Sequence, residues 1–220
     1  MTIPTNGRGL PGLTYPEAFL GRLAVELGEK YAGTFSAETV QRYVLDSYTA
    51  LLRTSKVKAH LAIQTKHFVG ERLTALAQVA GVAPHDLPEV LYICEQNAGR
   101  SQMAAAITAH LSNGRVHVRS AGSLPAHQLN PDVVTALAEA GIPLEDAYPK
   151  PLTDDVVQAA DVVVTMGCGD ACPIYPGKRY EDWQLADPAE LDLDGVRGVR
   201  DSIIEHVTSL LGEIAVAPAV

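Results

Sequence analysis

The chain has 220 residues, of which 47% are hydrophobic and 20% are charged, a composition typical of a globular protein with one large or two small domains. The formal net charge of −9 is concentrated in residues 83–220, where eight basic residues stand against twenty acidic ones, whereas residues 14–82 have eight against six. So acidic a C-terminal part repels polyanions, which excludes extended nucleic acid as the expected substrate but still allows a small anion at a locally positive loop.

The N-terminal residues 1–7 show no basic segment followed by an apolar one, so we expect no secretory signal. No apolar run is long enough to span a membrane, and no membrane partner is expected. Three cysteines in such a chain predict reduced thiols with a chemical role, and therefore a cytoplasmic protein.

Residues 15–80 predict three amphipathic helices. Ser36 is expected to cap the second, and Gly33 and Gly81 follow the first and the third. The short connections predict a small three-helix bundle. Because its core is modest, we expect an apolar stripe to pair with a second copy, giving a homodimer through these helices. The stripes include Leu20, Leu23, Leu27, Val40, Val44, Leu51, Leu61, Phe68 and Leu73.

Proline and glycine residues between 81 and 88 predict a linker, so the expected domains are residues 1–82 and residues 83–220. Beyond the linker, strand and helix patterns alternate, which predicts an α/β fold with a four-stranded parallel sheet and helices on both faces. The expected strands are 89–93, 115–119, 161–166 and 178–185. The expected helices are 100–112, 131–140, 154–159 and 193–211.

The segment Cys94–Ser101 reads Cys-Glu-Gln-Asn-Ala-Gly-Arg-Ser and joins the first expected strand to a helix. Backbone N–H groups of such a loop form a socket for a tetrahedral oxyanion. The same donors, the helix N-terminus and Arg100 favour the thiolate form of Cys94, the nucleophile of phosphoryl or arsenyl transfer. The alternative is a small buried thiol before an ordinary helix. The expected binding residues are Glu95, Gln96, Asn97, Ala98, Gly99, Arg100 and Ser101.

Two loop residues allow more than one interpretation. Asn97 either holds the loop through side-chain to backbone hydrogen bonds or tolerates a left-handed backbone. Ser101 is either the N-cap of the helix or a donor to the sulfur of Cys94, and these two roles are compatible.

Parallel strands end at the same edge of a sheet, so the segments that follow them should meet there. Cys94 follows the first strand, Cys168 and Cys172 follow the strand 161–166, and Asp187 follows the last strand-like segment. The topology therefore predicts that a nucleophile, two further thiols and a carboxylic acid converge.

Each of these partners also has a plainer interpretation. Asp187 is expected to be a general acid, and the alternative is a turn residue before proline. Gly167 and Pro173 predict a flexible loop in which Cys168 and Cys172 form a redox pair. The alternatives are buried fillers or, with Cys94, zinc ligands, but no histidine has the spacing of a fourth ligand, so no metal is expected.

These residues give the chain, from about residue 89 to 211, a resemblance to the low-molecular-weight protein tyrosine phosphatases, and within that family to the thioredoxin-coupled arsenate reductases. Residues 15–82 resemble the three-helix segment found ahead of some members. The matching segments are Cys94–Ala104, Arg119–Gly122, Leu129–Pro131 and Asp187–Pro188.

Within this family two activities compete. The resemblance implies arsenate reduction, because reductases of this kind carry two cysteines after the third strand, as Cys168 and Cys172 do here. Phosphatases usually carry a second cysteine in the loop, where Gly99 stands, and an aromatic residue after Asp-Pro, where Ala189 stands. Some relatives bind potassium through a glutamate, and Ala105 at that position predicts that the cation site is absent.

The reaction implied by the resemblance needs sulfur alone. Cys94 attacks arsenate held by the loop and Arg100, and Asp187 protonates the departing hydroxyl. Cys168 then attacks the sulfur of Cys94, and Cys172 moves the disulfide to the surface for reduction by a thioredoxin-type protein. No flavin, nicotinamide or metal is required. The alternative is a phosphatase that hydrolyses aryl phosphates.

A non-enzyme alternative is a DNA-binding or scaffold protein that uses the helical segment. Its support is a mildly basic patch of Arg53, Lys56, Lys58 and Lys66. Because no recognition helix is evident, no nucleic-acid partner is expected, and dimerisation is the favoured role of the helices.

Overall fold

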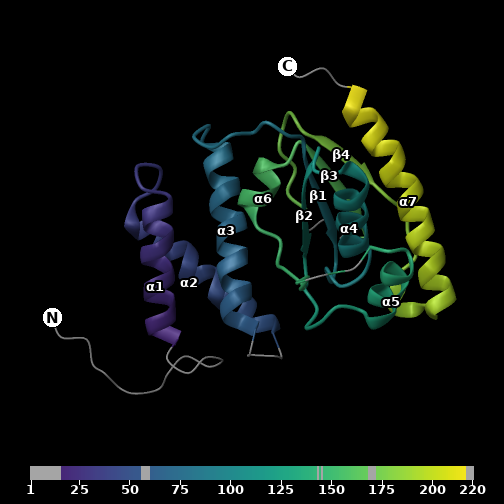
Figure 1. Ribbon diagram of the computed structural model, residues 1–220, viewed down its shortest axis with the longest axis horizontal. Helices are drawn as coiled ribbons and strands as arrows, with labels where there is room; N and C mark the ends of the chain where they lie inside the picture. Colours follow the sequence, from purple (N-terminus) through teal and green to yellow (C-terminus); the bar gives the residue numbers. More distant parts are fainter. Residues whose placement is uncertain (1–15, 56–59, 143, 145, 168–171, 217–220) are drawn as a thin grey trace. The chain divides into compact units, whose positions relative to one another are not determined.

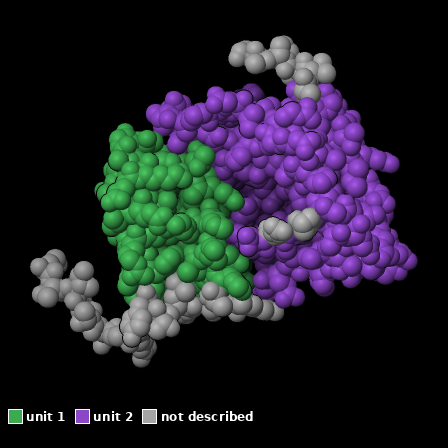
Figure 2. Space-filling model, in the orientation of Figure 1, with its two compact units in different colours: residues 1–74 green, residues 75–220 purple. Residues whose placement is uncertain are grey.

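The structure is a computed structural model that describes residues 16–55, 60–142, 144, 146–167 and 172–216 (Figure 1). The chain forms two compact units, residues 1–74 and residues 75–220 (Figure 2). The division falls within the third helix, and the domain boundary expected at residue 82 stays a prediction. No helix in the described ranges is both long and apolar enough to cross a membrane.

The first unit is helical, as predicted. Ser36 has the expected capping role, because its hydroxyl accepts a hydrogen bond from the backbone N–H of Thr39 at 3.1 Å. The predicted stripes are buried, and the fully buried Tyr48 and Phe68 are among their largest side chains. The helices are α1 (Pro16–Lys30), α2 (Ala37–Thr54) and α3 (Leu61–Val79), whose last residues belong to the second unit.

The second unit is built on a four-stranded parallel sheet in the order β2-β1-β3-β4, which confirms the predicted fold class. Its strands are β1 (Glu89–Cys94), β2 (His117–Gly122), β3 (Val162–Met166) and β4 (Arg179–Asp182). Its helices are α4 (Arg100–Ser112), α5 (Pro131–Glu139), α6 (Asp154–Ala159) and α7 (Leu193–Val216), with a short 3-10 helix, η3 (Pro188–Glu190).

The central strand β1 is buried on both faces, and its side chains alternate between two cores. Val90, Tyr92 and Cys94 belong to the core formed with α4, α5 and α7. Leu91 and Ile93 belong to the core formed with α6, on the other side of the sheet (Figure 1). This two-residue period places the thiol of Cys94 on the α4 face, at the carboxyl end of the strand.

Two predicted strands were wrong in their bounds. The fourth was expected over residues 178–185, but β4 runs only from Arg179 to Asp182. The second strand is displaced along the chain. Residues 115–119 were expected, but β2 begins at His117 and runs to Gly122. The turn after α4 extends to Arg115, whose backbone N–H donates to the carbonyl of Ser112 at 3.1 Å. Ser120, Ala121 and Gly122 have low strand propensity, and pairing with β1 decides their conformation.

A buried ion-pair cluster joins the amino ends of the strands. Glu89 is 1% exposed and accepts hydrogen bonds from Arg119 at 2.9 Å and from His117 at 3.0 Å. Gln78, near the end of α3, donates to Glu89 and accepts from Arg119 at 3.0 Å. Burial alone would raise the pKa of Glu89, but the hydrogen bonds and charges of His117 and Arg119 outweigh it and lower the pKa to about 2.

We predict that Glu89→Gln destabilises the second unit at pH 7 by roughly 3 kcal/mol, because Arg119 would stay buried without its partner charge. The low pKa also sets the pH dependence: the stabilisation is complete above about pH 4.5, the ordinary pKa, and is lost as the pH falls through about 2. Urea unfolding at pH 7, 4 and 3 measures both effects. An equal acid-induced loss of stability in wild type and Glu89→Gln would contradict the assignment.

Candidate active site

The loop between β1 and α4 surrounds the sulfur of Cys94. Cys94 is 2% exposed, and its Sγ lies 2.9 Å from the hydroxyl of Ser101 and 3.2 Å from the backbone N–H of Asn97, which donates to it. Ser101 was expected as a possible N-cap, but the capping position is Gly99. The hydroxyl of Ser101 is therefore turned to the sulfur rather than to the end of the helix.

Asn97 combines the two roles considered for it. Its backbone is left-handed, with φ at 47°, and its side chain is fully buried. The side-chain nitrogen donates to Ser101 at 2.8 Å, and Oδ1 accepts from the backbone N–H of Lys150 at 2.8 Å and from Gln102 at 2.9 Å. The amide of Asn97 thus ties the loop to α4 and to the segment around Lys150.

Gly122, the last residue of β2, allows the loop to lie against the sheet. A Cβ atom at this position would stand 2.7 Å from the carbonyl oxygen of Glu95 and 2.9 Å from Cβ of Asn97. Its N–H and carbonyl pair with Lys150 and Leu152, so the strand end cannot easily move away. Only a residue without a side chain fits here.

Arg100 opens α4 and forms an ion pair with Asp187. One guanidinium nitrogen lies 2.6 Å from Oδ2 of Asp187, and the other donates to the carbonyl of Leu185 at 3.4 Å. The Oδ1 atom of Asp187 accepts from the N–H of Ala189 at 3.0 Å and so caps η3. The guanidinium also lies against Gly167, where a Cβ would stand 2.9 Å from it.

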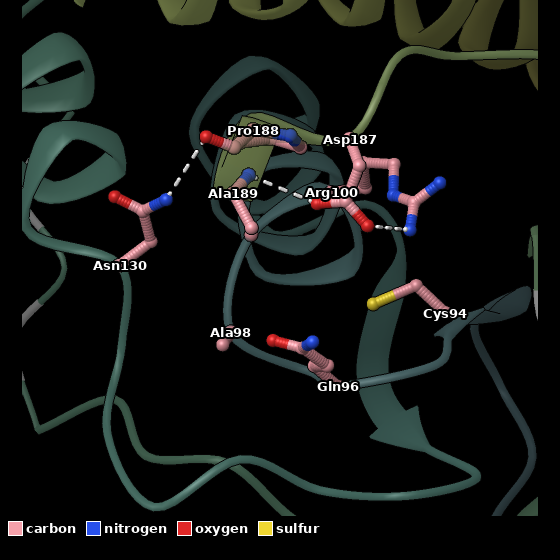
Figure 3. A pocket seen from close by; sticks show the side chains of 9 residues that line it. Cys94, Gln96, Ala98, Arg100, Asn130, Asp187, Pro188 and Ala189 are labelled. Atoms are coloured by element: carbon pink, nitrogen blue, oxygen red, sulfur yellow. Dashed lines mark hydrogen bonds and ion pairs between the residues drawn. The ribbon is translucent and has the colours of Figure 1, made fainter. Parts of the chain in front are cut away.

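A small pocket opens above the sulfur, between the loop, the start of α5 and η3 (Figure 3). The side chain of Cys94 points into it, and the Arg100–Asp187 ion pair forms one wall. The first turn of α4 adds N–H groups that have no partner within the helix. The described residues that line the pocket are Cys94, Gln96, Ala98, Gly99, Arg100, Asn130, Asp187, Pro188 and Ala189.

Three predicted binding residues do not line this pocket. Asn97 and Ser101 are fully buried beside the sulfur and act on it through hydrogen bonds. The side chain of Glu95 is exposed, and its carbonyl accepts from the N–H of Leu124 at 2.8 Å. The other predicted loop residues, Gln96, Ala98, Gly99 and Arg100, do line it.

One polar residue of the pocket, Asn130, belongs to the matching segment Leu129–Pro131 but was not among the predicted site residues. Its Oδ1 caps α5 through the N–H of Asp132 at 2.9 Å, and its amide nitrogen donates to the carbonyl of Pro188 at 3.2 Å. Its backbone N–H also bonds to the carbonyl of Ala98. The Asn-Pro pair is a signal for a helix start, but the contact with η3 depends on tertiary structure.

The two later cysteines, Cys168 and Cys172, follow β3 in the sequence. Cys168 lies outside the described residues. Cys172 is partly buried and packs against the core on the α6 face, opposite the core that contains Cys94. In the described part of the chain, no group of three or more His, Cys, Asp or Glu side chains is placed to hold a metal ion.

The sequence of the chain matches two known protein families. Residues 89–217, more than half of the chain, match the family described as low molecular weight phosphotyrosine protein phosphatase, and residues 20–77 match the family described as protein-tyrosine-phosphatase-like, N-terminal domain. The chain belongs to the low molecular weight phosphotyrosine protein phosphatase family.

Several relatives carry the name arsenate reductase. The solved structure of the thioredoxin-dependent arsenate reductase of Corynebacterium glutamicum is 46% identical, with a TM-score of 0.82, over 92% of this chain and 98% of that one. The putative arsenate reductase of Halobacterium salinarum is 32% identical over 56% of this chain and 89% of its own length. The glutaredoxin arsenate reductase of Synechocystis sp. is 31% identical over 59% of this chain and 100% of its own length.

We predict that Gly122→Ala displaces the loop, because its new methyl group would overlap the backbone around Glu95 and Asn97. The expected cost is about 1–3 kcal/mol of unfolding free energy, together with loss of inorganic phosphate binding measured by calorimetry. Gly198→Ala is the matched control, since Gly198 lies within α7 with nothing within 4 Å of its Cβ position. Unchanged phosphate binding in Gly122→Ala would contradict the role given to this glycine.

Proposed function

We propose that this protein reduces arsenate to arsenite through Cys94 and a disulfide cascade. The observation that carries the proposal is the buried sulfur of Cys94 at an anion-sized pocket, between a helix N-terminus, Arg100 and Asp187. The names of the relatives support arsenate as the oxyanion.

Arsenate binds in the pocket over the first turn of α4. The N–H groups of the turn and the positive end of the helix favour a tetrahedral anion, and the guanidinium of Arg100 offers two parallel donors. In the structure the carboxylate of Asp187 forms an ion pair with the guanidinium of Arg100. The incoming oxyanion therefore replaces Asp187 as the partner of the Arg100 guanidinium. The carboxyl group of Asp187 is then free to face the oxygen that leaves the arsenic.

The first step forms a sulfur–arsenic bond. The thiolate of Cys94, stabilised by Ser101 and the N–H of Asn97, attacks arsenic(V), and a hydroxyl leaves as water with a proton from Asp187. The loop donors hold the negative charge that develops on the remaining oxygens.

The reduction follows when a second thiol attacks the Cys94 sulfur. The Cys168 thiolate forms the Cys94–Cys168 disulfide, and the electron pair of the sulfur–arsenic bond passes to arsenic, which leaves as arsenite. Cys172 then attacks Cys168, which frees the Cys94 thiolate and leaves a Cys168–Cys172 disulfide. The position of Cys172 on the α6 face, away from the core of Cys94, supports this order of attack.

An external dithiol protein returns the enzyme to its reduced form. The thioredoxin-dependent relative, which matches 92% of this chain, favours a thioredoxin-type donor. The glutaredoxin-named relative makes glutaredoxin the comparison to include in the assay. We place the reaction in the cytoplasm, where thiols stay reduced, and assign the helices of the first unit to homodimer formation.

Hydrolysis of aryl phosphates is the activity that the family description suggests instead. An aryl group needs an apolar or aromatic wall beside the loop. None of the nine described residues that line the pocket is aromatic, and Ala189 stands beside Pro188 at the rim (Figure 3). The small lining favours a small inorganic oxyanion.

We predict that Cys168→Ser abolishes steady-state arsenate reduction, because the adduct on Cys94 would have no attacking thiol. The measurement is arsenate-dependent NADPH oxidation with thioredoxin and its reductase, run beside glutaredoxin with glutathione. Cys94→Ser should be inactive in every assay. Full turnover of an aryl phosphate by Cys168→Ser, with no arsenate reduction by wild type with either donor, would assign the protein as a phosphatase.

We predict that Asp187→Asn binds inorganic phosphate about five- to tenfold more tightly, because no carboxylate competes for Arg100. Arsenate turnover should fall by about 10²–10⁴-fold, since the proton donor is gone. Asp182→Asn is the control: Asp182 is an exposed carboxylate on β4, and its change should alter neither quantity. Equal phosphate affinity in wild type and Asp187→Asn would contradict the competition for the guanidinium.

A further inference from the structure

We propose that Gln102 is a positioning residue, which fixes the orientation of the Asn97 amide and thereby turns the hydroxyl proton of Ser101 toward Cys94. This inference rests on the proposed role of Cys94 as the nucleophile, but not on arsenate as the substrate. It adds to the site a residue that lies outside the pocket.

Gln102 is 5% exposed, in the first turn of α4, and its side-chain nitrogen has three acceptors. These are the carbonyl of Asn97 at 3.2 Å, Oδ1 of Asn97 at 2.9 Å and the carbonyl of Tyr148 at 3.0 Å. Because two of the acceptors are backbone carbonyls, the nitrogen of the Gln102 amide, not its oxygen, must face this cluster.

Gln102 reinforces the orientation of the Asn97 amide. The side-chain oxygen of Asn97 is held by two donors, the backbone N–H of Lys150 and the amide of Gln102. Its nitrogen must then point the other way, to the hydroxyl oxygen of Ser101 at 2.8 Å. An amide nitrogen only donates, so Ser101 accepts this bond.

The same reasoning assigns the direction of the hydroxyl proton of Ser101. Once the oxygen of Ser101 accepts from Asn97, its own O–H is available for the sulfur of Cys94, 2.9 Å away. A hydroxyl that donates to the sulfur stabilises the thiolate. If the amide of Asn97 were reversed, its oxygen would draw the proton of Ser101 away, and the thiolate would lose a donor.

Gln102→Met removes the donor at similar size, and Gln102→Glu places a carboxylate against the same acceptors. We expect both changes to move the half-maximal alkylation of Cys94 by iodoacetamide to higher pH by about one unit, the effect of one hydrogen bond to a charged group. Mass spectrometry of the Cys94 peptide separates its alkylation from that of Cys168 and Cys172.

Thr108→Val is the matched control. Thr108 is fully buried on the same helix and bonds to the hydroxyl of Tyr92 at 2.7 Å, away from the loop. It should lower stability without moving the alkylation profile. Because the profile needs no arsenate, a shift in a protein without reductase activity would support Gln102 and reject the proposed substrate.

Folded Gln102→Met and Gln102→Glu proteins with the wild-type profile would overturn the proposal. Wild type offers an independent measurement if the variants do not fold. The side-chain amide protons of Gln102 should exchange with solvent much more slowly than those of Gln41, which is exposed on α2. Equally fast exchange of the two amides would overturn the proposal as well.

Discussion

The shape of the loop between β1 and α4 depends on the buried side chain of Asn97. Asparagine tolerates a left-handed backbone better than most residues with a side chain, but a buried amide without partners costs about 1–3 kcal/mol. Asn97 has a φ of 47° and is 0% exposed, and its hydrogen bonds to Ser101, Gln102 and Lys150 remove this cost. These bonds come from two segments far apart in the sequence, and the loop therefore depends on the fold as a whole.

The electrostatic potential at the pocket is positive although the protein has a negative net charge. The reason is that most acidic side chains are farther from the pocket than Arg100. Most of the acidic excess lies on exposed side chains, where water and salt screen it within about 10 Å. The guanidinium of Arg100 is largely buried and, with the N-terminal turn of α4, lies directly at the pocket. Among the described residues that line the pocket, Asp187 carries the one carboxylate, and its ion pair neutralises Arg100. In the proposed reaction the oxyanion takes the place of this carboxylate.

Local signals in the sequence predicted much of the fold. The apolar run ending at Cys94 gave the central strand, and Ser36 gave the start of α2, because both depend on neighbouring residues. The bounds of β2 were wrong because Ser120, Ala121 and Gly122 extend only through pairing with β1. Gly122 contacts Glu95, and Gly167 contacts Arg100. The residues of each pair are distant in the chain, so no local sequence pattern could predict these contacts.

The loop chemistry alone cannot separate a reductase from a phosphatase. Phosphate and arsenate have the same shape and charge, so Cys94, Arg100 and Asp187 would serve the first attack on either atom. The difference arises at the next step. Arsenic(V) can accept the electron pair of its bond to sulfur and leave as arsenite, whereas the phosphorus(V) adduct on the cysteine is hydrolysed by water.

The reaction is therefore a reduction when a thiol attacks the Cys94 sulfur before water attacks the adduct. Cys172 packs on the α6 face and Cys94 on the α4 face of the sheet, so a direct bond between them would require one thiol to leave its core. Cys168 follows the last residue of β3 by two positions in the sequence and precedes Cys172 by four, and it is the thiol that attacks Cys94 in the proposed cascade. In the proposed cascade, the choice between reduction and hydrolysis is thus set by a thiol beyond the third strand rather than by the oxyanion loop itself.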